Sequence, residues 1–144
     1  MSAKRRALVL AFPVVAAFSL SACMTDSRTQ ILASDKSQVQ LRAVQTRVFD
    51  TGDRAMVFRS VLATLQDLGF VVDKADDTLY LASATKLGGY VLRMTVLVQP
   101  RGPRQTAVRA SAQYDLVAVT DAAPYQQFFD ALEKAMFLTA NKIE

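Results

Sequence analysis

Apolar residues return every three or four positions in two segments of this 144-residue chain, which is the spacing of helices that bury one face. The first segment follows Asp53, a favourable N-cap residue, and ends before Gly69, which suits the position after a helix. The second begins around Asp121 and Pro124, because proline is tolerated in a first helical turn. We therefore predict two helices. Their apolar stripes comprise Val57, Phe58, Val61, Leu62, Leu65 and Leu68 in the first, and Phe128, Phe129, Leu132, Ala135, Met136, Thr139, Ala140 and Ile143 in the second.

Shorter stretches in which apolar and polar residues alternate predict five strands. Turn-forming sequences separate them, such as the Gly88-Gly89 pair and the run 100–103. In the fourth strand the even-numbered residues of 92–98 are all apolar, so this face is expected to pack on the helices. The strands are predicted over residues 41–49, 70–72, 78–85, 90–98 and 106–119.

These elements follow the order β-α-β-β-β-β-α along the chain. We predict an α+β fold, namely an antiparallel β-sheet with two helices packed on one face. A chain of this length has room for one ordinary domain with a single core. We expect that domain to span residues 40–144.

The first 22 residues have the three-part layout of an export signal. Basic residues occupy positions 4–6, and an apolar stretch over 7–20, interrupted by Pro13, follows them. A membrane-spanning anchor is the alternative, because residues 7–25 form an uncharged run of 19 positions, near the lower limit of the roughly 17–25 residues that cross a bilayer. The proline and the small polar residues dilute this run and favour a cleaved signal peptide.

Leu20, Ser21 and Ala22 directly precede Cys23, the only cysteine of the chain. This tetrapeptide resembles the lipobox of bacterial lipoproteins, in which an aliphatic residue and two small ones precede the cysteine that receives lipid. The resemblance implies that signal peptidase recognises the first three residues and cuts before Cys23. It also implies a diacylglyceryl thioether on Cys23 and an acyl chain on its new amine, and more than one chain is needed for lasting membrane residence. A buried structural cysteine is the alternative.

The position after the cysteine guides sorting in enterobacterial lipoproteins, where an aspartate favours retention in the inner membrane. This chain has Met24 there, and Asp26 follows two positions later. The resemblance therefore implies the outer membrane, with the domain on its periplasmic face, and leaves the inner membrane as the alternative. Residues 23–39 are polar with little apolar periodicity, so beyond the lipidated cysteine we predict a flexible tether.

The charge balance and the counts of histidine and cysteine argue against several classes of function. The formal charge is +4, but three of the 17 basic residues lie in the signal segment, which leaves 14 against 13 acidic residues. That balance provides no basic footprint for nucleic acid. The chain has no histidine and one cysteine, so the usual zinc ligands, the commonest general base and an internal disulfide are all missing. We expect no cofactor, no metal and no enzymatic activity.

Two local clusters invite a chemical interpretation. Asp73, Asp76 and Asp77 have a spacing that could contribute to a calcium site, although aspartates at this density more often form a solvated turn. Gly88-Gly89 lacks the lysine and the following helix of a phosphate-binding loop, which favours a hairpin turn.

Two further sets of residues could contact a partner. The first is a basic edge facing lipid headgroups or another protein, although such charges more often keep sheet edges soluble. The second is an aromatic anchor on the last helix, although its bulk also suits the core of a small domain. The basic set is Lys86, Arg93, Arg101 and Arg104, and the aromatic set is Tyr125, Phe128 and Phe129.

Four segments, 45–50 (QTRVFD), 65–70 (LQDLGF), 125–129 (YQQFF) and 137–138 (FL), resemble small proteobacterial lipoproteins of unassigned role over residues 44–143. The order of elements is similar to that of the helix-grip domains of the BamC family, accessory lipoproteins of the outer-membrane β-barrel assembly machinery. BamC proteins have two such domains behind a long disordered arm, whereas this chain has one domain and a short tether. The resemblance implies a helix-grip-like domain on an outer-membrane lipoprotein.

A clear anchor without a recognisable catalytic set favours a noncatalytic envelope module that binds an outer-membrane or periplasmic complex through a protein partner. One alternative is a periplasmic carrier that encloses an apolar ligand between the sheet and the C-terminal helix, which would require a continuous internal pocket. Another is a hydrolase using Asp or Ser, for which the sequence offers no candidate pair.

Overall fold

The computed structural model describes residues 37–140, apart from the side chains of residues 139 and 140. A helix over residues 37–45 comes first in the described chain. The later elements are β1 Thr46–Phe49, α2 Arg54–Asp67, β2 Val71–Asp76, β3 Leu81–Leu87, β4 Val91–Pro100, β5 Thr106–Tyr114, β6 Val117–Ala118 and α3 Ala123–Ala140. The predicted signal peptide, Cys23, most of the tether and Ile143 lie outside the described residues.

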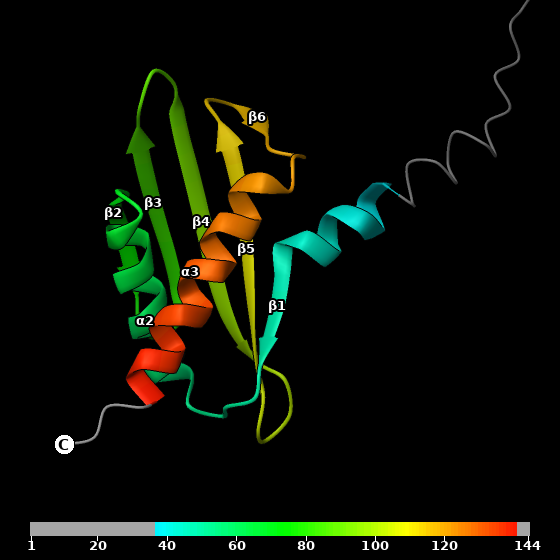
Figure 1. The fold of residues 1–144 in the computed structure, drawn as a ribbon, viewed down its shortest axis with the longest axis vertical. Coiled ribbons are helices and arrows are strands. Elements are labelled where there is room, and N and C mark those ends of the chain that lie inside the picture. The colour runs from blue at the N-terminus through cyan, green and yellow to red at the C-terminus, as the bar shows by residue number, and fades with distance from the viewer. Residues whose placement is uncertain (1–36, 141–144) are drawn as a thin grey trace, which may run out of the picture.

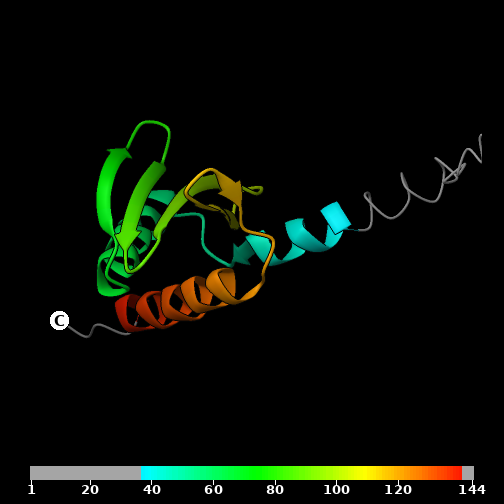
Figure 2. The ribbon, with the colours of Figure 1, turned by 90° about the horizontal axis from the view of Figure 1, so that it is seen from above.

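All strands belong to one antiparallel sheet with the order β1-β5-β4-β3-β2, and β6 also pairs with β5 (Figure 1). Helices α2 and α3 contact each other and cover one face of this sheet (Figures 1 and 2). The predicted α+β class, with an antiparallel sheet and two helices on one face, is therefore confirmed. The helix over 37–45 and the short β6 are additions to the predicted order.

Both ends of α2 follow local rules of the sequence. The Asp53 side chain accepts a hydrogen bond from the Met56 amide at 2.9 Å, which caps the first turn. At the other end Gly69 has φ +82°, and the Phe70 amide donates to the Leu65 carbonyl at 2.9 Å. That is the Schellman arrangement, so the predicted start and stop of this helix are both confirmed.

The core lies between the helices and the sheet. Met94, Val96 and Val98 of β4 are buried, which confirms that the even-numbered face packs on the helices. The strands on either side contribute small side chains at the same level, and these leave room for the aromatic rings of α3. The small buried residues are Ala82 and Ala84 on β3 and Ala110 and Ala112 on β5.

Residues 41–45 are helical, so the predicted strand over 41–49 is wrong in its first half. Leu41 and Val44 pack against the core and Gln45 is buried. Their spacing of three and four is the helical period, so the interpretation of this segment as an imperfectly alternating strand was wrong. Only β1, over the second half of the predicted segment, pairs with β5.

The predicted strand over 106–119 is also divided. It turns back at residues 115–116, and β6 then pairs with the end of β5. Asp115 has φ +52°, a conformation that aspartate tolerates better than most residues. The result is a two-residue hairpin at the end of the sheet.

The hydroxyl of Tyr125 completes the hydrogen bonding along one side of β5. On that side β1 pairs with β5 only as far as Arg109, and β6 pairs only from Gln113. Between them, the Ala112 amide donates to the Tyr125 hydroxyl at 3.2 Å, and the hydroxyl donates to the Val119 carbonyl at 2.8 Å. Because buried backbone groups need partners, this fully buried side chain joins α3 to the sheet.

The same hydroxyl accepts a hydrogen bond from Gln45 Nε2 at 3.1 Å. Replacing Tyr125 with Phe keeps the ring but leaves three buried polar groups without this partner. We expect the free energy of unfolding to fall by about 2 kcal/mol or more, measured by urea denaturation. Tyr80→Phe, which keeps the ring that packs on Phe58, is the matched control. A loss no larger than that of the control would contradict this role.

Gly52 lies where the β1–α2 turn meets the β4–β5 loop. A Cβ atom there would come within 2.6 Å of the Pro103 carbonyl oxygen, so one of the two segments would have to move. We expect Gly52→Ala to destabilise the domain by about 1–3 kcal/mol through overpacking, as measured by thermal or urea denaturation. Gly88→Ala is the control, since nothing lies within 4 Å of its added Cβ. Equal stability of the two variants would refute the close approach.

Candidate functional site

The residues predicted to receive and direct the lipid, Leu20, Ser21, Ala22 and Cys23, lie outside the described part of the chain. Ser37, the first described residue, follows Cys23 by 14 positions. Among the described residues, no helix is long and apolar enough to cross a bilayer.

The three aspartates do not share one turn, because Asp73 lies within β2 and only Asp76 and Asp77 lie at the β2–β3 connection. Asp76 Oδ1 accepts hydrogen bonds from the amides of Thr78 and Leu79 at 3.0 and 2.9 Å, which forms the predicted turn. Asp73 accepts from the Thr85 hydroxyl at 2.6 Å. Within residues 37–140, no group of three His, Cys, Asp or Glu side chains could hold a metal ion. Asp76 and Asp77 therefore form the predicted turn. Strand β2 runs on to Asp76, past the predicted end at residue 72, and β3 starts later than predicted, at Leu81.

Gly88-Gly89 forms the turn of the β3–β4 hairpin, as predicted. The Gly88 amide donates to the Tyr90 carbonyl at 3.2 Å, and Gly89 has φ +80°. No helix follows the glycines, because β4 begins at Val91. The geometry is that of a hairpin turn and not of a phosphate-binding loop.

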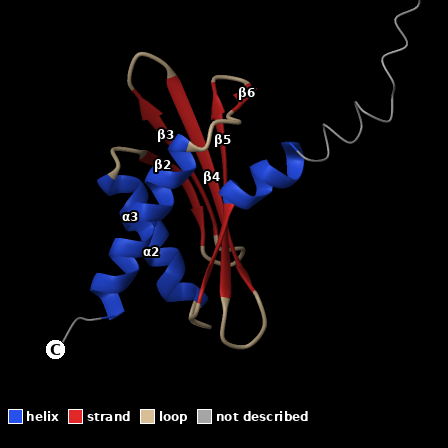
Figure 3. Ribbon diagram, turned by 45° about the vertical axis from the view of Figure 1, so that its right-hand side comes forward, coloured by secondary structure: helices blue, strands red, loops and turns tan. Residues whose placement is uncertain are grey.

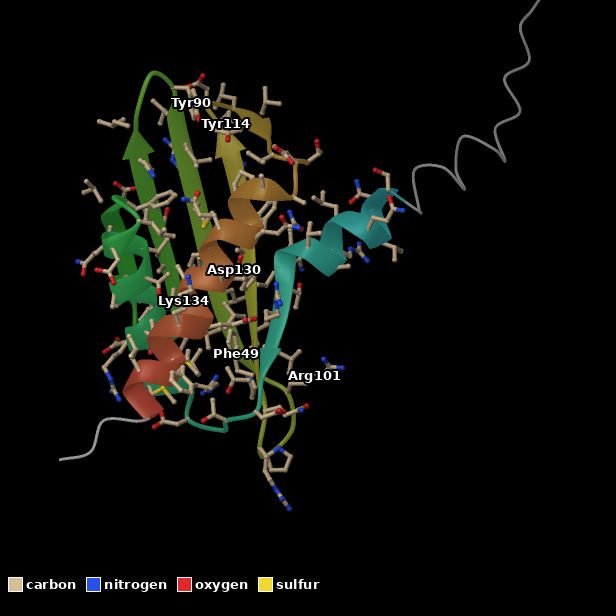
Figure 4. All side chains as sticks on the ribbon, in the orientation of Figure 1. Phe49, Tyr90, Arg101, Tyr114, Asp130 and Lys134 are labelled. Carbon is tan, nitrogen blue, oxygen red and sulfur yellow. The ribbon has the colours of Figure 1, made fainter. Side chains whose placement is uncertain are left out.

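The four basic residues do not form one edge. Arg93 is exposed near one end of β4, and Arg101 follows the other end of the same strand, about 26 Å away at the usual rise per residue. Figure 4 shows Arg101 at the end of the sheet opposite to Tyr90. Lys86 faces the helices instead, with its Nζ 5.7 Å from the centroid of the Phe70 ring. The hypothesis of a single basic edge is therefore wrong, because successive residues of a strand point to opposite faces.

The aromatic residues of α3 belong to the core. Tyr125, Phe128 and Phe129 are at most 1% exposed, and the two phenylalanine rings pack edge to face at 5.2 Å. They cannot serve as an exposed anchor for a partner. Together with Leu132 they fill the space between the sheet and α3, where a carried ligand would have to bind.

A groove opens where the β3–β4 hairpin meets the start of α3, with a volume of about 240 Å³. Pockets that enclose drug-sized ligands usually measure about 300–1,000 Å³, so this groove is smaller than most of them. A larger hollow of about 700 Å³ lies on the solvent side of α3, where every lining residue is exposed. The groove is lined by Lys86, Gly88, Tyr90, Leu92, Tyr114, Asp121, Ala123, Pro124 and Gln127, and the hollow by Asp130, Glu133, Lys134, Phe137 and Leu138.

Two tyrosines form one wall of the groove (Figure 4). The rings of Tyr90 and Tyr114 pack edge to face, with centroids 4.7 Å apart. The pKa of Tyr114 is raised above the ordinary value of 10.0, first by loss of hydration, then by the hydrogen bond and charge of Tyr90, and then by the charge of Asp121. Tyr114 therefore stays neutral at physiological pH.

Four exposed apolar side chains gather beyond this groove, at the end of the sheet, and we call them the apolar tip. They are Leu87, Tyr90, Leu116 and Val117, which are 75%, 58%, 89% and 71% exposed. They come from two turns that lie side by side, the β3–β4 hairpin and the β5–β6 turn (Figure 1). Apolar residues grouped in this way often mark an interaction site.

The sequence pattern did not predict the apolar tip. Leu116 and Val117 fall inside the predicted strand over 106–119, where alternate residues are expected to be buried, Tyr90 begins the predicted strand over 90–98, and Leu87 has no predicted role. The signal that could have found it is the pair of large apolar residues on either side of Gly88-Gly89, because the tip of a hairpin is exposed to solvent.

Comparison with known proteins adds no relative. No protein-family model matches the chain, and no curated protein sequence matches it significantly.

Removing the hydroxyl of Tyr90 should lower the pKa of Tyr114 toward its ordinary value. A raised pKa means that the folded state keeps a proton that the unfolded state loses, so stability falls as the pH rises above about 10. Tyr90→Phe should reduce both the shift and this alkaline loss. The Cζ chemical shift of Tyr114, followed by NMR during a pH titration, measures the effect. An unchanged midpoint, equal to that of the Tyr80→Phe control, would contradict the coupling.

Proposed function

We propose that this chain is a lipid-anchored, noncatalytic envelope protein that binds or stabilises a complex at the outer membrane or in the periplasm. The observation that carries the proposal is Leu20-Ser21-Ala22-Cys23, which follows a basic and then an apolar segment. A diacylglyceryl thioether on the thiol and an acyl chain on the new amine would supply enough chains for lasting attachment. Met24, where an aspartate would favour the inner membrane, supports the outer membrane.

The residues available for chemistry support a binding role. The chain has no histidine, and the carboxylates that cluster in sequence, Asp73 and Asp76, accept hydrogen bonds within the β2–β3 region. A near-balanced charge after Cys23 favours a protein partner over nucleic acid. A carrier role would need an enclosed space beside α3, which buried rings such as Phe128 occupy.

Metabolic labelling with an alkyne palmitate tests the anchor. We expect the wild-type protein to carry the label and to fractionate with the outer membrane, and Cys23→Ala to lose both the label and the cleavage. Ser21→Ala keeps a small residue before the cysteine and should be labelled normally. Met24→Asp should move labelled protein toward the inner membrane.

Two results would refute the proposal. Label that persists in Cys23→Ala would place the lipid elsewhere. Unlabelled, uncleaved wild-type protein in the inner membrane would replace the lipid with a spanning anchor, which the uncharged run over residues 7–25 could supply.

A further inference from the structure

We propose that the apolar tip is a second, noncovalent membrane contact, through which the domain inserts into the interface of the bilayer that holds its lipid. The inference rests on the proposed lipid anchor at Cys23, because that anchor keeps the domain next to a bilayer. It adds an orientation, with the end of the sheet that carries the β3–β4 hairpin and the β5–β6 turn facing the membrane.

The apolar tip is one end of the sheet, where backbone and ring contacts join the two turns, with Leu87 on the helix-free face and Val117 on the helix face. The Asp115 amide donates to the Val91 carbonyl at 2.9 Å, which joins the β5–β6 turn to β4. Val117 pairs with Tyr114, whose ring packs on the ring of Tyr90. The two turns therefore present their exposed side chains from a firm base, without having to change conformation to meet a bilayer.

The chemistry of the apolar tip suits the membrane interface. Leucine and valine gain from entering the apolar layer, whereas a tyrosine favours the headgroup level, where its ring is buried and its hydroxyl stays hydrated. Leu116, the most exposed of the four, stands at the turn itself. Insertion of the tip would bury apolar side chains in the bilayer, which a lipid anchor keeps within reach of the domain.

The position of the described N-terminus agrees with this orientation. Leu41 and Val44 of the helix over 37–45 line a hollow with Thr120 and Ala122, which follow β6, so the chain enters the domain beside the segment that leaves the tip (Figure 3). The 14 positions from Cys23 to Ser37 reach at most about 50 Å when extended. The ten residues of β4 span about 33 Å, so a tether of this reach lets either end of the sheet approach the membrane. The entry of the chain beside the segment that follows β6 is what favours the tip.

Charges close to the apolar tip are balanced. Lys86 and Arg93 lie in the adjoining parts of β3 and β4, and Asp115 and Asp121 lie in and after the β5–β6 turn. An electrostatic attraction to anionic lipid is therefore not expected to drive the contact. Binding through the tip should persist at high salt and without anionic lipid.

The absence of tryptophan from the chain makes a clean experiment possible. Leu116→Trp places a single reporter at the apolar tip, and Leu138→Trp places one at an exposed site on α3, 66% exposed in the native chain. Each full-length variant is produced with the alkyne palmitate label and reconstituted into phosphatidylethanolamine vesicles that contain brominated phosphatidylcholine. Tryptophan emission and its quenching by bromine are then measured at low and high salt.

We expect blue-shifted emission for Leu116→Trp and quenching at least about twofold stronger than for Leu138→Trp, at both salt concentrations. Adding Leu87→Asp to Leu116→Trp should weaken the quenching, because a charge at the tip opposes insertion. Equal quenching of the two reporters would overturn the membrane contact. A blue shift that needs no vesicles and grows with protein concentration would also overturn it, in favour of a second copy of the chain on the tip.

The label separates this inference from the proposed function. Labelled protein without tip quenching would leave the lipid anchor intact and refute the second contact alone. Protein that takes up no label but still shows quenching at the tip would refute the lipid anchor through the missing label. It would also show that the tip binds a bilayer by itself.

Discussion

The buried hydroxyl of Tyr125 is the interaction on which the architecture depends most. It lies in the gap between β1 and β6 along β5, where it accepts a hydrogen bond from the Ala112 amide and donates one to the Val119 carbonyl. It also accepts a hydrogen bond from the side-chain amide of Gln45, at the end of the helix over 37–45. A single group therefore fixes the sheet, the segment before α3 and the start of the domain relative to one another. Without this hydroxyl, the buried polar groups that bond to it would be left without a hydrogen-bond partner.

The core is filled by side chains, so a partner or ligand would have to contact the surface of the domain. Alanines on β3 and β5 make room for the rings of Phe128 and Phe129, and these rings fill the space between the sheet and α3. The groove left at the end of the sheet is small. A domain with this interior is better suited to offering surfaces than to enclosing a molecule.

The two membrane contacts that we propose have different physical roles. A lipid on Cys23 would hold the domain near the bilayer but leave its orientation free, because a polar tether transmits little torque. The apolar tip, built on paired strands, would restrict that orientation. A partner protein would then meet the same part of the domain on each encounter, and the helix-free face of the sheet and the solvent side of α3 would both be open to it (Figure 2).

Local rules in the sequence determined the α+β class, both ends of α2, the Gly88-Gly89 turn and the buried face of β4, since caps, glycine conformations and side-chain periods act over a few residues. The proposed lipobox is likewise read from the sequence, as a linear motif. Only the tertiary structure decided that residues 41–45 are helical, that the last strand folds back at Asp115, and that Leu87 and Leu116 lie at the same end of the sheet. Those outcomes depend on partners distant in sequence, such as Tyr125 for Gln45 and Val91 for Asp115, which no local pattern specifies.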